Sequence, residues 1–370
     1  MNGERSLPTP LARPLRATID LAAIAHNTAI VRQRIGPDVR FYAVCKNDAC
    51  GAGAREVAPT LIRAGADAFA VSTIEDAESI LRADLHRPIL LYPALPADML
   101  ADASKLGVTI SIHDHASLDA AASANHDVPA FIKVDCGFGR LGVLPDDFPE
   151  MMAMIAKSTR IKLKGLYTHF SSVENPDFMR KQIVRFEKAI GEAKAAGFSN
   201  IEIMAASSRV IRDYPELNFN AVNPGRFLFG LIEDDWGDAM AHKPAISITS
   251  RIVQIKALPA NYGARRKDES APKRIAVVIG GFRDGLPQAP SKLSFLVRGQ
   301  RAPLVSPPTT EYCSIDITNI NGVTLDDEVV LLGAQSDQTM SCAEFAQASG
   351  FPALSLVPQI AKSVPRIYLD

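Results

Sequence analysis

Residues 41–53 read FYAVCKNDACGAG, an apolar run that ends at Lys46 and is followed by small residues. An Ala-rich amphipathic stretch comes next, and the same alternation continues to about Gly230, as expected of repeated βα units. Eight short apolar runs can be counted: FYAV (41–44), AFAV (68–71), ILLY (89–92), TISI (109–112), AFIKV (130–134), LKGLY (163–167), IEIM (201–204) and NAV (220–222). Eight parallel strands joined by helices predict a closed TIM-type (β/α)8 barrel.

The alternative to a barrel is an open, doubly wound sheet. Such a sheet normally carries a GxGxxG turn after its first strand, and the turn here is KNDACGAG. The barrel is therefore the favoured prediction.

The sequence changes character after Gly230. Short strand-like runs separated by Gly, Pro and Asn follow one another, with one helix-like segment near CAEFAQASG (342–350). The runs are SITSRIVQIKALP (247–259), RIAVVIGG (274–281), KLSFLVRGQ (292–300), CSIDIT (313–318) and EVVLLG (328–333). We predict an α/β barrel over residues 15–235 and a β-rich domain formed by residues 1–14 and 236–370.

Composition narrows the class of partner. Lys and Arg total 40 against 41 Asp and Glu, a net charge of −1, so nucleic acid and anionic membranes are not expected partners. No apolar run approaches the length of a membrane span, and the N-terminal residues lack the apolar stretch of a secretion signal. Five scattered cysteines indicate reduced thiols in a cytoplasm, and without a CxxC pair no metal site is expected. We expect a cytoplasmic protein that acts on a small molecule.

Lys46 is the candidate reactive residue because it follows the first strand of the expected barrel. Active sites of such barrels lie at the carboxyl ends of the strands, and phosphate is often held after the seventh and eighth strands. A lysine in an enclosed pocket has a destabilised ammonium, and its neutral amine can condense with an aldehyde. A lone lysine at a strand end is more often a surface residue, so context must decide.

That context comes from a set of landmarks in a fixed order and spacing: RATIDLAAIAHNTAIVRQ (16–33), YAVCKNDACGAG (42–53), AFAVSTIEDAESIL (68–81), IKVDCGFGRLGV (132–143), LYTHFSS (166–172), AASSRVIRDYP (205–215), NPGRFLFGL (223–231), GGFRDG (280–285) and SVPRIY (363–368). Together they resemble the bacterial alanine racemase family, and the resemblance extends from Arg16 to Tyr368. The family implies a fold-type III enzyme that uses pyridoxal 5′-phosphate. It also implies a homodimer in which the β-rich domain contributes to the partner's active site.

The resemblance assigns roles position by position. Lys46 matches the Schiff-base lysine, which also serves as one base at Cα, and Lys133 matches a lysine that is carbamylated in some members. Arg140 matches the arginine that contacts the cofactor's phenolic oxygen and the substrate carboxylate, and His169 matches a histidine near the pyridine ring. Cofactor positions are further matched by Ser207, Ser208, Asn223, Gly225, Arg226 and Cys50. Thr310 matches a substrate-binding position.

Several positions depart from the family pattern. The opposite-face tyrosine base of a G-Y-x-D-G motif is Phe282, and a phenyl ring can neither take nor give a proton. Asn223 stands where an arginine usually faces the pyridine nitrogen, while Cys50 and Leu354 stand where tyrosines bind phosphate. Arg226, usually an apolar position, offers a compensating positive charge for the phosphate.

These departures leave alternatives open. The first is an amino-acid racemase with Lys46 as one base and Tyr312 or Cys313 of the partner subunit as the other. The second is an enzyme of altered chemistry on the same cofactor, such as an aldolase or decarboxylase, and the third is a non-catalytic cofactor-binding homologue. A metal-dependent barrel hydrolase would use the His113-Asp114-His115 segment, a pattern that often occurs by chance.

Overall fold

The computed structural model describes residues 13–92, 95–260, 262, 273–288 and 292–370. Residues 1–12 of the predicted 1–14 segment therefore lie outside the described part. By its internal contacts the chain divides into two compact units. Within the described residues, one unit holds residues 25–49 and 54–228, and the other holds residues 13–24, 50–53 and 229–370.

The first unit is a barrel. In the described residues its eight-stranded parallel sheet runs in the order β4-β3-β2-β9-β8-β7-β6-β5, and a parallel bridge between Leu90 and Thr109 joins its two edges. The strands are β2 (Arg40–Val44), β3 (Ala68–Val71), β4 (Ile89–Leu91), β5 (Ile110–Ile112), β6 (Val128–Lys133), β7 (Ile161–Tyr167), β8 (Glu202–Ala206) and β9 (Ala221–Val222). Each of the eight predicted runs overlaps one of these strands, and the predicted barrel is confirmed.

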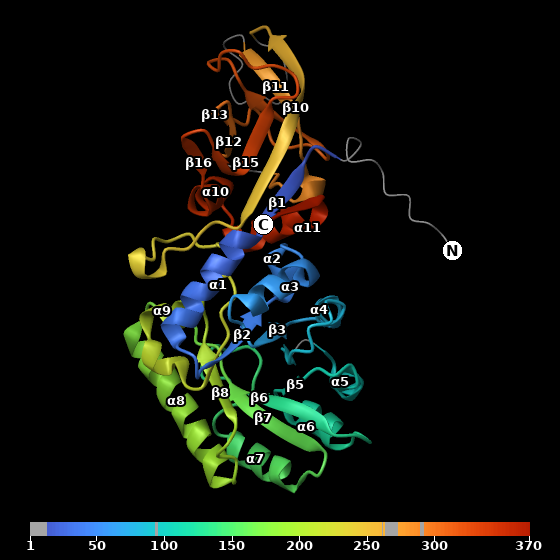
Figure 1. Ribbon diagram of the computed structural model, residues 1–370, viewed down its shortest axis with the longest axis vertical. Helices are drawn as coiled ribbons and strands as arrows, with labels where there is room; N and C mark the ends of the chain where they lie inside the picture. Colours follow the sequence, from blue (N-terminus) through green and yellow to red (C-terminus); the bar gives the residue numbers. More distant parts are fainter. Residues whose placement is uncertain (1–12, 93–94, 261, 263–272, 289–291) are drawn as a thin grey trace, which may run out of the picture. The chain divides into compact units, whose positions relative to one another are not determined.

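Helices cover the outside of the barrel (Figure 1). They are the C-terminal part of α1 (Leu21–Ile35), α3 (Ala54–Arg63), α4 (Ile74–Leu81), α5 (Ala97–Ser104), α6 (His115–Ala122), α7 (Phe148–Lys157), α8 (Pro176–Ala195) and α9 (Ser208–Asp213), with a 3-10 turn, η2 (Pro215–Asn218). A short turn, α2 (Lys46–Cys50), separates β2 from α3.

The barrel core explains why its strands are apolar on both faces. Alternate residues such as Tyr42 and Val44 of β2 fill the interior together with Phe131 and Tyr167. The intervening residues, Phe41 and Ala43 in β2, are also fully buried, because the covering helices exclude water from the outer face.

The second unit is built on a nine-stranded sheet, counted over the described residues. Its strands are β1 (Arg16–Asp20), β10 (Ile246–Leu258), β11 (Lys273–Ile279), β12 (Ser294–Val297), β13 (Gln300–Pro303), β14 (Tyr312–Asp316), β15 (Glu328–Gln335), β16 (Gln338–Met340) and β17 (Arg366–Leu369). The strand β1 pairs antiparallel with β10 and parallel with β17, so this early segment lies in the β-rich unit.

The β-rich unit also contains two helices, α10 (Cys342–Ser349) and α11 (Ala353–Ser363), and the 3-10 turns η3 (Asp238–Met240) and η4 (Phe282–Asp284). The sequence predicted one helix in this region, and that prediction was wrong by one. Helix α11 begins directly after Pro352 and contains Pro358, and such prolines usually mark breaks between elements. The apolar contacts of its buried residues override that local signal.

Candidate active site

Four of the predicted site residues lie at or just after the carboxyl ends of three barrel strands. Lys46 comes two residues after β2, Lys133 ends β6, Arg140 lies in the loop after β6, and His169 follows β7. Burial lowers the pKa of His169 to about 4, and three positive charges act in the same direction, those of Lys133, Lys46 and Arg140. The barrel therefore brings these four side chains to one end, where they form a positively charged region around a neutral imidazole.

Lys133 is the buried member of this group, with 6% of its surface exposed. Burial lowers the pKa of its ammonium to about 8, against the opposing influence of Cys136 and Asp135. Its Nζ donates to the Val134 carbonyl oxygen at 3.1 Å and lies 5.4 Å from the centre of the Tyr167 ring. A substantial fraction of this amine is neutral slightly above pH 7.

Arg140 is positioned by a loop wrapped around one carboxylate. Asp135 accepts hydrogen bonds from the backbone N–H groups of residues 137, 138 and 139 through Oδ1 and from that of Arg140 through Oδ2. Burial alone would raise the pKa of Asp135, but these donors outweigh it and lower the pKa. The Arg140 guanidinium carbon lies over the Phe138 ring, 4.2 Å from its centre. The centres of the Phe138 and His169 rings are 5.7 Å apart.

Asp135 was missed by the sequence analysis. The signal that could have found it is the stretch Asp135-Cys-Gly-Phe-Gly-Arg140, because an aspartate followed by glycines often accepts hydrogen bonds from its own loop.

The predicted phosphate-side residues follow β8 and β9. The backbone N–H of Gly225 donates to Ser208 Oγ at 3.1 Å, and a Cβ added to Gly225 would lie 3.2 Å from Val44 Cβ. Ser207 is the N-cap residue of α9, and Arg226 is half-buried beside Gly225. Two adjacent barrel loops therefore meet at Ser208 and Gly225.

Asn223 is buried at the start of the second of these loops. Its Nδ2 donates to the Tyr92 hydroxyl at 2.9 Å. Its Oδ1 is buried and has no hydrogen-bond partner in the described part of the chain. An unsatisfied buried acceptor is costly, so this atom indicates a place for a donor from a bound molecule.

The loop after Lys46 differs from the sequence expectation. The small residues 49–53 were read as an ordinary loop, but α2 is a left-handed turn in which Asn47, Asp48, Ala49 and Cys50 all have φ between 53° and 58°. Cys50 is buried, whereas Lys46 is exposed in the single chain. The described residues of one barrel therefore do not supply the desolvation expected for the lysine amine.

Phe282, Thr310 and Tyr312 belong to the β-rich unit. Phe282 and Thr310 line a cavity of about 580 Å³ together with Gln288 and residues 307–309. Tyr312 begins β14 opposite Ile279 of β11, and its side chain is 46% exposed. The thiol of Cys313 is buried, and burial raises its pKa to about 12. Of the two predicted replacements for a tyrosine base, only Tyr312 presents an accessible proton-transfer group.

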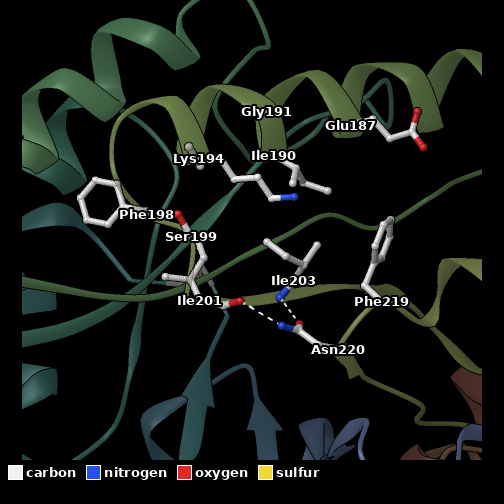
Figure 2. A pocket seen from close by; sticks show the side chains of 11 residues that line it. Glu187, Ile190, Gly191, Lys194, Phe198, Ser199, Ile201, Ile203, Phe219 and Asn220 are labelled. Carbon is white, nitrogen blue, oxygen red and sulfur yellow. Dashed lines mark hydrogen bonds between the residues drawn. The ribbon is translucent and has the colours of Figure 1, made fainter.

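A cavity of about 520 Å³ lies elsewhere on the barrel unit (Figure 2). It lies between the end of α8 and the start of β8, where the Asn220 side chain donates to the Ile201 carbonyl oxygen and accepts from the Ile203 N–H. The start of β8 is at the opposite end of the barrel from Lys46, so this cavity is separate from the candidate site.

Within the His113-Asp114-His115 segment, Asp114 has a structural role. Asp114 caps α6 by accepting from the Ser117 N–H at 2.7 Å. Among the residues that the structure describes, no group of three or more His, Cys, Asp or Glu is arranged to hold a metal ion. All five cysteines are free and buried. No helix in the described ranges has the length and apolar character needed to span a membrane.

Comparison with known proteins identifies both units. Residues 19–233 match the family model for the alanine racemase N-terminal domain, and residues 245–368 match that for the C-terminal domain. An alanine racemase from Desulfosudis oleivorans is 32% identical over 376 residues and covers 96% of each chain. One from Methanococcus maripaludis is 29% identical and covers 97% of this chain and all of that one.

Solved structures agree with the sequence relatives. The alanine racemase of Bacillus anthracis with bound L-Ala-P superimposes with a TM-score of 0.90 at 26% identity, over 98% of this chain and 96% of that one. The enzyme from Streptomyces lavendulae gives a TM-score of 0.88 at 26% identity, over 99% and 98% of the two chains. Since both domain models match in order and the relatives span nearly the whole length, the chain belongs to the alanine racemase family of pyridoxal 5′-phosphate-dependent isomerases.

Proposed function

We propose that this protein interconverts the L- and D-enantiomers of a small amino acid, with alanine as the first candidate, by using pyridoxal 5′-phosphate bound to Lys46. The observation that carries the proposal is the convergence of Lys46, Lys133 and Arg140 on His169, whose pKa they help to lower. Three cations at one end of a barrel suit a cofactor and a substrate that both carry negative charge.

The residues at the barrel mouth fit this cofactor. Lys46 would hold it covalently, and Ser207, Ser208, Gly225 and Arg226 would hold its phosphate. The unpartnered Oδ1 of Asn223 offers an acceptor to the ring nitrogen, provided that the nitrogen is protonated. His169 would lie against the ring as a neutral imidazole, in keeping with its lowered pKa.

The bound cofactor supplies an electron sink that acidifies the Cα proton of an amino acid attached to it. In the proposed mechanism the Lys46 amine removes or returns that proton on one face of Cα. Arg140 binds the substrate carboxylate, since a guanidinium matches a carboxylate with two parallel hydrogen bonds. Lys133 would support Arg140 as a carbamate, the form that the resemblance implies for this position, because its ammonium repels the guanidinium. Thr310 of the partner subunit would complete the carboxylate site.

Racemisation needs a second group on the opposite face, where Phe282 replaces the family's tyrosine. We assign this role to Tyr312 of the partner subunit in a homodimer. The exposure of Tyr312 supports the assignment, as does its place beside the Phe282 turn, where the Gly280 N–H donates to the Glu311 carbonyl oxygen at 2.9 Å. The buried, high-pKa thiol of Cys313 argues against that residue. The five free cysteines support the proposed cytoplasmic location.

Incubation with the cofactor and a panel of L- and D-amino acids in D₂O tests the proposal, with deuterium at Cα read by NMR alongside chiral analysis. We expect deuterated product of inverted configuration, and none from Lys46→Ala. Tyr312→Phe should lower kcat by roughly 10² to 10⁴, the usual contribution of a general acid or base, while Cys313→Ser should leave it within about twofold.

Restoring the family residue with Phe282→Tyr should raise kcat and make the Tyr312→Phe change less damaging, because two phenols would then compete for one role. If the cofactor binds through Lys46 and no amino acid yields an inverted, deuterated product, racemisation is refuted. Equal effects of Tyr312→Phe and Cys313→Ser would refute the assignment of the second base alone.

A further inference from the structure

The backbone after Lys46 adopts a conformation that its sequence does not favour. Asn47, Asp48 and Ala49 have φ/ψ near 55°/50°, and Cys50 has φ of 56°. None of these residues is glycine, and L-residues rarely visit this region in succession. Interactions from elsewhere in the fold must therefore stabilise the turn.

A single carboxylate provides much of that stabilisation. Asp76 Oδ2 accepts from the Asn47 N–H at 3.0 Å, and its Oδ1 accepts from the Asp48 N–H at 2.8 Å. Both oxygens of Asp76 are thus directed at the two N–H groups that follow Lys46. Asp76 is only 7% exposed, so water competes little for these bonds.

The neighbouring elements account for this placement. Strands β2 and β3 pair in parallel, with Val44 opposite Ala70, and the Cys45 N–H donates to the Ala70 carbonyl oxygen at 2.8 Å. Helix α4 starts shortly after β3, and Asp76 is its third residue. The residues on both sides of Lys46 are therefore hydrogen-bonded to the same βα unit, Cys45 to β3 and Asn47 to α4.

The sequence suggests a different use for Asp76. Thr73-Ile-Glu-Asp76 has the pattern of a capping box, in which the acidic side chain returns to its own helix start. In the structure the Thr73 hydroxyl accepts from the Asp76 N–H at 3.1 Å, and the Asp76 carboxylate binds the Lys46 turn instead. By contrast, α6 has both halves of its capping box.

We infer that Asp76 is a positioning residue for Lys46, acting through the backbone of the left-handed turn. The inference rests on the proposed role of Lys46. By fixing the Asn47 and Asp48 N–H groups, Asp76 fixes the direction in which the Lys46 side chain leaves the backbone. The carboxylate does this only as an acceptor, so Asp76→Asn, which replaces one oxygen by a donor, breaks one of the two bonds without changing the size of the side chain.

The first measurement is amide hydrogen exchange of residues 47–49 in the protein without cofactor. Asp76→Asn should speed exchange there by roughly tenfold or more, whereas Asp76→Glu should retain part of the protection. Glu75→Gln is the matched control, because it removes one charge from the exposed neighbour in the same helical turn. That control should leave residues 47–49 unchanged.

The second measurement is the rate at which added cofactor becomes covalently attached to Lys46, trapped by borohydride and read by mass spectrometry. Asp76→Asn should slow attachment and lower kcat by roughly tenfold to a hundredfold, with a smaller change in KM. The pH dependence of the bound cofactor's visible absorbance should shift in Asp76→Asn and not in Glu75→Gln.

The outcomes separate this inference from the proposed function. Unchanged exchange and attachment in Asp76→Asn would overturn the inference even if racemase activity is found. Faster exchange and slower attachment would support it even if no amino acid is racemised. If Asp76→Asn does not fold, exchange in the unaltered protein decides: protection of the Asn47 and Asp48 amides supports the inference, and exchange at the rate of an unfolded chain overturns it.

Discussion

Lys133→Met is expected to stabilise the cofactor-free protein at neutral pH. A lysine whose pKa falls from 10.5 to about 8 on folding is charged at pH 7 in both states, and its charge then costs the folded state about 3 kcal/mol. Because the unfolded chain binds more protons than the folded one between these two pKa values, stability lost to Lys133 is recovered as pH rises. At pH 9 the remaining cost is about 2 kcal/mol.

Methionine removes this cost and keeps most of the side-chain volume. The substitution also loses the bond from Nζ to the Val134 carbonyl oxygen and the contact with the Tyr167 ring, each worth about 1 kcal/mol. The Val134 carbonyl oxygen keeps a donor, since the Thr168 hydroxyl bonds to it at 2.9 Å. The net gain should therefore be about 1 to 2 kcal/mol at pH 7, and about 1 kcal/mol less at pH 9.

Urea unfolding at pH 7 and pH 9 measures this gain. The buffer must be free of carbonate, because a partly neutral amine can add carbon dioxide. The control is Lys164→Met, which removes an exposed lysine from β7 and should change stability by less than about 0.5 kcal/mol at both pH values. The reasoning would be refuted if Lys133→Met is less stable than the parent protein at pH 7. It would also be refuted if the increase in the free energy of unfolding is the same at both pH values.

Two further predictions concern the scaffold of the site. Gly165→Ala should prevent stable folding of the barrel, because the added Cβ would lie 2.3 Å from Phe131 Cε1 and 2.4 Å from the Glu202 carbonyl oxygen. The control is Gly191→Ala, in which the added Cβ meets open space, so thermal unfolding should show a stable Gly191→Ala protein and an unstable Gly165→Ala protein. Asp135→Asn should destabilise the protein at pH 7, because an amide donor would face the Arg140 N–H. The difference in the free energy of unfolding between this variant and the parent should shrink in acid, because the lowered pKa of Asp135 means that its stabilising charge is lost there. The loss should begin only below about pH 4, because the ordinary pKa of 3.8 is the upper limit of the window, so an equal difference at pH 7 and at about pH 3 would contradict the second prediction.

Much of the barrel was predictable because its signal is local. A strand such as Phe41–Val44 is apolar on both faces, and a helix follows it within a few residues, so the pattern is visible without any distant contact. The same pattern of strands and helices places Lys46, Lys133 and His169 near the ends of predicted strands. Their convergence follows in turn, because parallel strands of one barrel bring their carboxyl ends to one edge.

Features set by remote contacts were not predictable in this way. Helix α11 forms despite Pro358 because its buried residues pack into the β-rich unit. Asp76 carries no local mark that separates it from an ordinary capping residue, whereas Asp135 binds only its own loop and its local signal was overlooked. Their importance lies in the backbone N–H groups they bind, and in the case of Asp76 those groups are 28 and 29 residues away.

The sequence by itself determined the alternation of strands and helices in the barrel and the lysine at the end of its first strand, because side-chain periodicity is set by neighbours along the chain. Only the tertiary structure decided that β1 joins a sheet with β17, almost 350 residues later, and that the turn after Lys46 is left-handed. Both depend on hydrogen-bond partners that only the folded chain brings together, since a backbone N–H carries no sequence signature of its own.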